Sequence, residues 1–304
     1  MAKVSSLLMQ QVKLLLFLKN NFICFSSMNI IRHIPNTITS LNLLSGCFAV
    51  ILSFSGNFKG ALFMIIASAV FDFCDGFAAR LLKAYSPIGK ELDSLADMVS
   101  FGLAPATIMF NKMLHYFGED FKQGADHLAG LFNLEVAGST DIFSRILSLP
   151  FMEASGYMIP LLCALSIAVF SGLRLAKFNI DTRQTENFIG LATPSCALIV
   201  GSLIYACESY PQIDAFFAQN VYILAIVSVV LALLLVCEIP MFSFKFKSLR
   251  WADNRIKFSF LICALLIAVV QTLIMGGFSL SIWIFATFVC YILLNICVAL
   301  VPKR

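Results

Sequence analysis

Four aspartates stand at regular intervals in an apolar part of the chain. Asp72 and Asp75 are three residues apart, and Asp93 and Asp97 are four residues apart. A carboxylate at membrane depth costs at least about 2.5 kcal/mol even on the mildest insertion scales. The four therefore need a compensating partner, and the simplest partner is a divalent cation. Hard carboxylate oxygens suit Mg²⁺ or Mn²⁺, so we expect one of these ions.

The spacing also predicts how the carboxylates meet. One face of a first helix carries, at helical intervals, Asp72, Asp75, Gly76, Ala79 and Arg80. One face of a second helix carries Gly89, Asp93 and Asp97. Between them, Ser86 and Pro87 predict a turn and a new helix start. We therefore expect the two faces to converge at one edge of a membrane. Gly76, Ala79 and Gly89 are small, so a bulky ligand could lie close to the backbone there.

A structural alternative is a pair of buried helices held together by ion pairs. Only Arg80 lies among the four acids, with Lys83 and Lys90 at the edges. Three cations of which two are peripheral do not balance four carboxylates, so a cation site is the favoured interpretation.

The pattern resembles the signature of the CDP-alcohol phosphatidyltransferases, D-x2-D-G-x2-A-R-x8-G-x3-D-x3-D, and every fixed position is filled between residues 72 and 97. The resemblance implies transfer of a phosphatidyl group from CDP-diacylglycerol to a small alcohol, with release of CMP. It implies two metal ions, with Asp72, Asp75 and Asp93 as ligands. It also implies that Asp97 is both a ligand to the second ion and the general base.

Residues ahead of the signature fit the same family. The resemblance implies that CDP-diacylglycerol is contacted by Pro35, Asn36, Thr37, Thr39, Asn42, Gly76, Ala79, Arg80 and Ser86. Each polar member also has a simpler role. Pro35 and the hydroxyls suit a helix start, Arg80 could pair with Asp75 or Asp72, and Ser86 could cap the helix before Pro87.

The acceptor alcohol is indicated by residues 93–106, D-S-L-A-D-M-V-S-F-G-L-A-P-A, which resemble the phosphatidylserine synthase branch of the family. The run R-L-A-K-F-N at 174–179 agrees with that branch, and Met98 stands where the glycerophosphate branch usually has a basic residue. The resemblance therefore implies L-serine, with Arg174 or Lys177 holding its carboxylate or a lipid phosphate. These two cations could instead be ordinary interface anchors at a helix end.

Two other functions stay open. Glycerol 3-phosphate could replace serine in the same reaction. A transporter could use intramembrane acids as an ion site, but that class predicts internal repeats and acids near the bilayer midplane. We find no repeat, and the acids are predicted at one edge.

The composition predicts an all-α, polytopic membrane helix bundle. The chain is 60% hydrophobic and 12% charged, with a mean hydropathy of +0.91. About eight transmembrane helices are expected at 37–56, 59–82, 91–115, 155–178, 190–208, 217–237, 257–276 and 280–301. A polar insert at about 116–152 separates the third from the fourth. An interfacial helix at Met28–Ile38 is expected before the first span.

Charge placement predicts the orientation. With the N-terminus in the cytoplasm, only four of the 21 Lys and Arg residues fall on the other side, namely Lys59, Lys112, Lys122 and Arg145. This bias favours an even number of spans and an active site that faces the cytoplasm.

We divide the chain into a basic and apolar extension (1–27), the phosphatidyltransferase membrane domain (28–260) and additional C-terminal helices (261–304). Many members of the family form homodimers, so a homodimer is expected here. The ten cysteines include no C-x-x-C pair and suit packing rather than zinc or disulfides.

Overall fold

The computed structural model describes residues 33–132, 146–181, 188–242, 251 and 254–300. Side chains of residues 120–132 lie outside this description. The first described helix, called the first helix below, is His33–Phe54. It is followed by α2 (Phe58–Leu81), α3 (Pro87–Asp97), a π-helix η1 (Met98–Leu103) and α4 (Ala104–Phe132). The later elements are α6 (Phe151–Ile180), β1 (Phe188–Ile189), α7 (Thr193–Ser209), α8 (Pro211–Gln219), α9 (Val221–Val236), β2 (Pro240–Met241), α10 (Arg255–Met275) and α11 (Leu280–Leu300).

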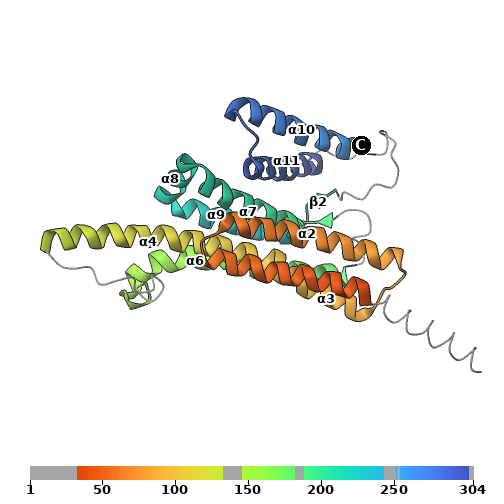
Figure 1. Ribbon diagram of the computed structural model, residues 1–304, viewed down its shortest axis with the longest axis horizontal. Coiled ribbons are helices and arrows are strands. Elements are labelled where there is room, and N and C mark those ends of the chain that lie inside the picture. The colour runs from red at the N-terminus through yellow and green to blue at the C-terminus, as the bar shows by residue number, and fades with distance from the viewer. Residues whose placement is uncertain (1–32, 133–145, 182–187, 243–250, 252–253, 301–304) are drawn as a thin grey trace, which may run out of the picture.

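The protein is a bundle of long helices, most of which lie side by side along the long axis of the molecule (Figure 1). The first helix and α2 lie side by side, and α3 sits at the end of the bundle where α2 finishes. The strands β1 and β2 lie at that same end, whereas α8 lies at the opposite end. The all-α, membrane-helix prediction is confirmed, with one two-stranded pair that the sequence did not predict.

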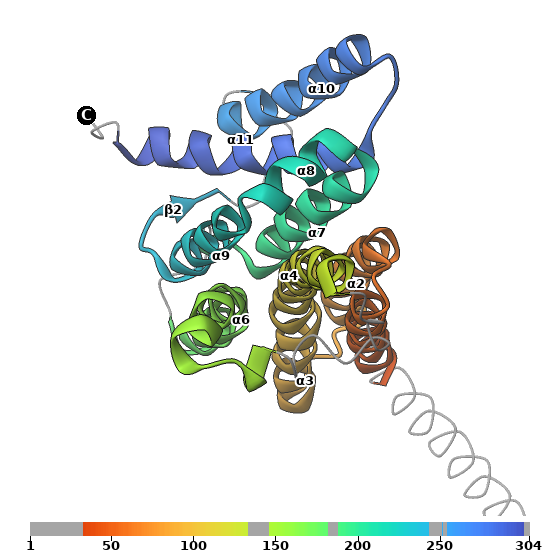
Figure 2. The same ribbon diagram turned by 90° about the vertical axis from the view of Figure 1, so that its left-hand side faces the viewer.

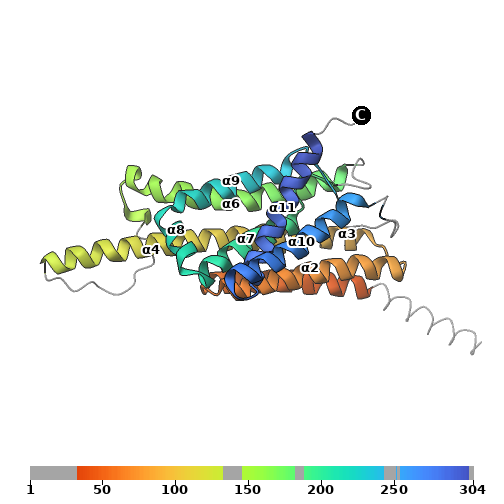
Figure 3. The ribbon, with the colours of Figure 1, turned by 90° about the horizontal axis from the view of Figure 1, so that it is seen from above.

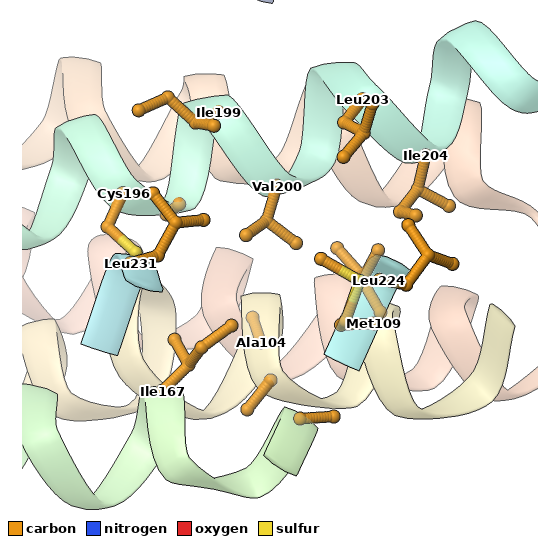
Figure 4. Packing of buried hydrophobic residues seen from close by; sticks show 14 of the residues in the cluster. Ala104, Met109, Ile167, Cys196, Ile199, Val200, Leu203, Ile204, Leu224 and Leu231 are labelled. Atoms are coloured by element: carbon orange, nitrogen blue, oxygen red, sulfur yellow. The ribbon is translucent and has the colours of Figure 1, made fainter. Parts of the chain in front are cut away.

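Helix α7 forms the centre of the bundle. Most of its residues are buried, and it packs against α2, α4 and α11 (Figure 2). Its Val200 and Ile204 meet Met109 of α4 and Leu224 of α9 in a continuous apolar core (Figure 4). Close packing of this kind fixes the positions of the helices relative to one another, because interdigitated side chains leave few voids.

The C-terminal pair lies outside this core. Helix α11 packs on α7 and runs obliquely across it, and α10 lies farther out (Figure 3). Both are highly apolar, and α10 exposes most of its surface, as a lipid-facing helix does.

Helices occur in all eight ranges predicted to span a membrane. Within the described residues, however, five helices are long and apolar enough to cross, or six if α8 and α9 count as one span. These two helices meet at a bend of 90°, so the sixth predicted span is broken rather than straight. The count of eight stays a prediction, because α7 is short and α3, η1 and α4 divide the third range among three elements.

Two further boundaries differ from the prediction. The first helix already includes His33–Ile38, so this part of the predicted interfacial helix continues directly into the first span, and residues 28–32 lie outside the described chain. The polar insert predicted at 116–152 is helical as far as Phe132. Polarity marks where a helix leaves an apolar environment, but it does not by itself end the helix. The extension 1–27 also lies outside the described residues.

A buried ion pair fastens α8 to α4 at the end of the bundle away from α3. The Lys112 ammonium lies 2.7 Å from a carboxylate oxygen of Asp214, and the Tyr116 hydroxyl donates to the same oxygen at 2.6 Å. The ammonium also lies over the Tyr116 ring, 4.6 Å from its centre. The Lys112 side chain is 5% exposed and that of Asp214 is 38% exposed. Removing the aspartate charge would therefore leave the buried lysine charge without its partner.

We therefore expect Asp214→Asn to destabilise the protein by about 2 kcal/mol, somewhat less than a fully buried pair because the aspartate is partly exposed. The measurement is thermal unfolding in detergent. The double variant Lys112→Met/Asp214→Asn should recover much of the loss, since no unpaired charge remains. A double variant less stable than Asp214→Asn alone would contradict this account.

Candidate active site

Three carboxylates converge at the end of the bundle where α2 meets α3. Asp72 and Asp75 project from α2 and Asp93 from α3, and one oxygen of each lies within 4.8 Å of the others. The i, i+3 spacing puts the first two on one helical face, as predicted. Asp75 is 6% exposed, and Asp72 and Asp93 are partly buried.

The turn between the helices makes this convergence possible. Lys83 adopts a left-handed conformation with φ of 51°, which ends α2 and reverses the chain. Ser86 then caps α3, accepting the Gly89 amide at 2.9 Å, and Pro87 occupies the first turn. The predicted turn and helix start at Ser86 and Pro87 are thus confirmed.

The donor set fits a hard divalent cation. It consists only of carboxylate oxygens, and one oxygen of Asp93 is buried without a hydrogen-bond partner. Among the described residues no lysine or arginine forms an ion pair with Asp72, Asp75 or Asp93. Arg80 is exposed and forms no ion pair within that part of the chain. Within the described residues the acids are therefore not balanced by neighbouring side chains, which is compatible with a cation site.

The first helix supplies polar contacts to two of the acids. The Thr39 hydroxyl donates to Asp75 Oδ2 at 2.6 Å, and the Asn42 amide donates to Asp97 Oδ1 at 3.2 Å. Both donors are buried. The carbonyl of Asn42 in turn accepts the hydroxyls of Ser68 and Ser100, at 3.2 and 3.0 Å. These bonds fix the orientation of the first helix relative to α2 and η1.

Asp97 is set apart from the other three acids. It ends α3 one turn after Asp93, it lies outside the group of three close carboxylates, and η1 begins at the next residue. A π-helix admits an extra residue in the turn and re-aims the side chains around it, and such segments are common at functional sites. The sequence analysis did not predict this segment.

Close helix crossings hold η1 in place. A Cβ atom at Gly46 of the first helix would collide with Ser100, including its backbone. A Cβ atom at Gly102 would lie 3.0 Å from the Cβ of Ser171 on α6. Only glycine allows both crossings at this distance, so η1 is clamped between the first helix and α6.

A pocket of about 200 Å³ opens beside the three acids. It is lined by Pro35, Asn36, Thr39, Asp75, Gly76, Ala79, Ala84, Tyr85, Ser86, Gly89, Lys90 and Asp93. Most residues predicted to contact CDP-diacylglycerol are among them. Thr37, Asn42 and Arg80 lie outside the lining, and the Thr37 hydroxyl donates to the carbonyl of His33.

The sequence analysis missed Ala84 and Tyr85 as pocket residues. Both belong to the turn between α2 and α3, where the signature has no fixed position. The feature of the sequence that could have indicated a pocket residue here was the aromatic Tyr85 in a short turn, and its side chain is largely exposed.

The two signature glycines serve different purposes. A Cβ atom at Gly76 would meet nothing within 4 Å, so this residue leaves open space in the pocket wall. A Cβ atom at Gly89 would lie 2.8 Å from the Asn36 side-chain oxygen and 2.9 Å from the Ser86 hydroxyl. Gly89 therefore allows the first helix to approach the start of α3.

Arg174 of α6 reaches the site from the other side. It is 7% exposed, its Nε has no hydrogen-bond partner among the described residues, and it lies one turn after Ser171, where α6 packs against η1. The Phe188 ring of β1 lies 5.9 Å from the Arg174 guanidinium. Lys177, by contrast, is exposed and lies 3.5 Å from Glu238. The structure thus brings Arg174, and not Lys177, beside the acids.

Comparisons with known proteins agree with the family that the sequence signature resembles. Residues 32–121 match the family model of the CDP-alcohol phosphatidyltransferases. The chain is similar to a CDP-diacylglycerol–serine O-phosphatidyltransferase of Bacillus subtilis, at 31% identity over 176 residues, which cover 57% of this chain and 77% of that protein. A protein of the same name from Helicobacter pylori is 29% identical over 55% of this chain, which spans about half (54%) of that protein's length. An archaetidylserine synthase of Methanothermobacter thermautotrophicus is 27% identical over 60% of this chain and 62% of its own length.

The acid cluster should bind Mn²⁺ in the absence of any substrate. We expect Asp93→Asn to weaken binding at least about tenfold, as measured by electron paramagnetic resonance of the purified protein. Glu91→Gln is the matched control, because Glu91 is an exposed acid on the same helix. Equal binding by both variants and the unaltered protein would contradict the assignment.

Proposed function

Because the chain belongs to the CDP-alcohol phosphatidyltransferase family, we propose that it transfers the phosphatidyl group of CDP-diacylglycerol to L-serine, giving phosphatidylserine and CMP. The observation that carries this proposal is the pairing of two features at one site. A cluster of carboxylates that no described cation neutralises lies beside the pocket, and Arg174, which is buried and whose Nε has no partner among the described residues, lies where α6 packs against η1, the element directly after Asp97. The first suits a diphosphate with its cations, and the second suits an acceptor that carries a carboxylate.

Asp72, Asp75 and Asp93 would hold a divalent cation, Mg²⁺ or Mn²⁺, and Asp97 would share in a second. Such cations supply charge neutralisation for the diphosphate and for the developing charge of the transfer. The geometry of the three close oxygens supports this assignment.

Asp97 is the proposed general base. Its Oδ1 is held by the Asn42 amide, and no described residue donates a hydrogen bond to Oδ2. We assign Oδ2 to take the proton from the serine hydroxyl, whose oxygen attacks the lipid-side phosphorus as the bond to CMP breaks. Phosphoryl-type transfers depend on positioning and charge stabilisation more than on covalent help, so fixing Asp97 between the first helix and η1 is the protein's main contribution to this step.

The pocket beside α2 is the proposed site for the nucleotide end of CDP-diacylglycerol. Asn36 and Ser86 offer polar contacts at its edge, and Gly76 leaves room for a ligand against the backbone. Arg80 is exposed and unpaired within the described chain, which leaves it available for a diphosphate oxygen. Thr37 stays a predicted contact without a place in the pocket lining.

Arg174 is the proposed partner of the serine carboxylate. A guanidinium can hold a carboxylate through two parallel hydrogen bonds, and a buried one gains most from doing so. Because α6 packs against η1 and Asp97 directly precedes η1, this position would bring the amino acid near the base. Lys177, on the same helix, already has Glu238 as a partner at the surface.

The site is proposed to face the cytoplasm, where serine and CMP are soluble metabolites. The placement of Arg80, Lys83 and Lys90 around it supports this orientation under the positive-inside rule. The homodimer and the division at residues 28 and 260 stay predictions.

The reaction is tested by CMP release from CDP-diacylglycerol by purified protein in detergent with Mg²⁺ or Mn²⁺. We expect release with serine but not with glycerol 3-phosphate or inositol phosphate. Asp97→Asn should lower kcat by roughly 10²–10⁴-fold, because the amide cannot accept the proton. Release with another acceptor would keep the reaction class and overturn serine. No release with any alcohol, from folded protein, would overturn the enzyme assignment.

The acceptor contact is tested separately with Arg174→Gln, which keeps hydrogen-bond donors but removes the charge. We expect KM for serine to rise about 10–100-fold and KM for CDP-diacylglycerol to stay within about twofold, since a hydrogen bond to a charged group contributes about 1.5–3 kcal/mol. Lys177→Gln is the comparison on the same helix and should change neither value more than about threefold. A larger effect of Lys177→Gln on the serine KM would contradict the assignment.

A further inference from the structure

Helix α11 reaches the surroundings of Arg174 through two buried polar side chains. Tyr291 and Asn295 are each 2% exposed, on a helix that is otherwise almost entirely apolar. Buried polar groups at membrane depth are costly unless they are used, and both are hydrogen-bonded here. Neither residue falls within the part of the chain that matches the family model.

The two side chains hold the backbone of a single residue. The amide of Phe242 donates to Asn295 Oδ1 at 3.0 Å, and the Tyr291 hydroxyl donates to the Phe242 carbonyl at 2.9 Å. The Asn295 amide donates to the carbonyl of Tyr291 at 2.7 Å, which fixes its own orientation. The Phe242 and Tyr291 rings are in edge contact, with centres 4.9 Å apart. Both backbone polar groups of Phe242, its N–H and its carbonyl, are thus hydrogen-bonded to side chains of α11.

Phe242 directly follows β2, and β2 pairs with β1. Met241 is opposite Phe188 in this antiparallel pair. The Phe188 ring is the one that lies over the Arg174 guanidinium. A two-stranded pair of two residues each has little stability of its own, so its position depends on what anchors its ends.

We propose that α11 completes the acceptor site: Tyr291 and Asn295 are positioning residues that fix Phe242 and, through the β1–β2 pair, hold Phe188 over Arg174. The inference rests on the proposed function, because Arg174 is there the partner of the serine carboxylate. It gives the C-terminal helices a role in acceptor binding in addition to membrane anchorage.

The experiment uses the full-length protein and the CMP-release assay. Tyr291→Phe removes one hydroxyl and keeps the ring in its aromatic contacts, and Asn295→Leu removes the hydrogen bonds at similar volume. We expect each to raise KM for serine about three- to tenfold, with kcat and KM for CDP-diacylglycerol within about twofold. Thr287→Val is the matched control on the same helix, because the Thr287 hydroxyl is buried and has no partner among the described residues. It should leave all three values unchanged.

A second measurement asks whether the effect passes through Arg174. In an Arg174→Gln background, Tyr291→Phe should change the serine KM by less than about twofold, because the group it positions is gone. An equal effect in both backgrounds would overturn the positioning role. So would an unchanged serine KM in both single variants, or a parallel rise in both substrate KM values with loss of thermal stability. If the unaltered protein released no CMP with serine, the proposed function itself would fail, and this inference with it.

Discussion

Carboxylates that lie close together inside an apolar bundle are the constraint on which the rest of the structure depends. Asp72, Asp75 and Asp93 repel one another and are poorly solvated, and no described cation pairs with them. Such a cluster is destabilising unless a ligand repays the cost. Packing elsewhere in the protein must therefore offset this destabilisation, and the densely packed α7 and its neighbours do so.

The position of Asp97 depends on backbone packing rather than on charge. Gly46 and Gly102 let the first helix and α6 approach η1 on two sides, and Ser100 donates to the carbonyl of Asn42 at the crossing. Asn42 then holds Asp97 through its side chain. Small residues at helix crossings are how membrane bundles bring backbones together, because lipid offers little hydrophobic force between helices. The same packing that stabilises the bundle thus orients the proposed base.

The charged side chains at the two ends of the bundle differ in how far they are paired. At the far end, Lys112 is paired with Asp214 and Tyr116, and the group is balanced within itself. At the end beside α3, Asp75 and Arg174 are buried, and among the described residues one oxygen of Asp93 and the Nε of Arg174 have no hydrogen-bond partner. Unsatisfied buried groups are costly in a fold and valuable in a binding site, where a ligand satisfies them. This difference supports the proposal that substrate binds at the end beside α3.

Local spacing was enough to predict the acid cluster, the turn at Ser86 and Pro87, and a bundle of apolar helices. These features depend on residues a few positions apart, where helical periodicity fixes which side chains share a face. Apolar length carries no information about the 90° bend between α8 and α9 or the π-helix after Asp97, so neither was predicted. The contact of Phe188 with Arg174, the pairing of Lys177 with Glu238, and the hydrogen bond between α11 and the residue after β2 were decided by tertiary structure alone. Each joins residues from different parts of the chain, and such contacts depend on how helices cross, which the pattern within a single helix does not determine.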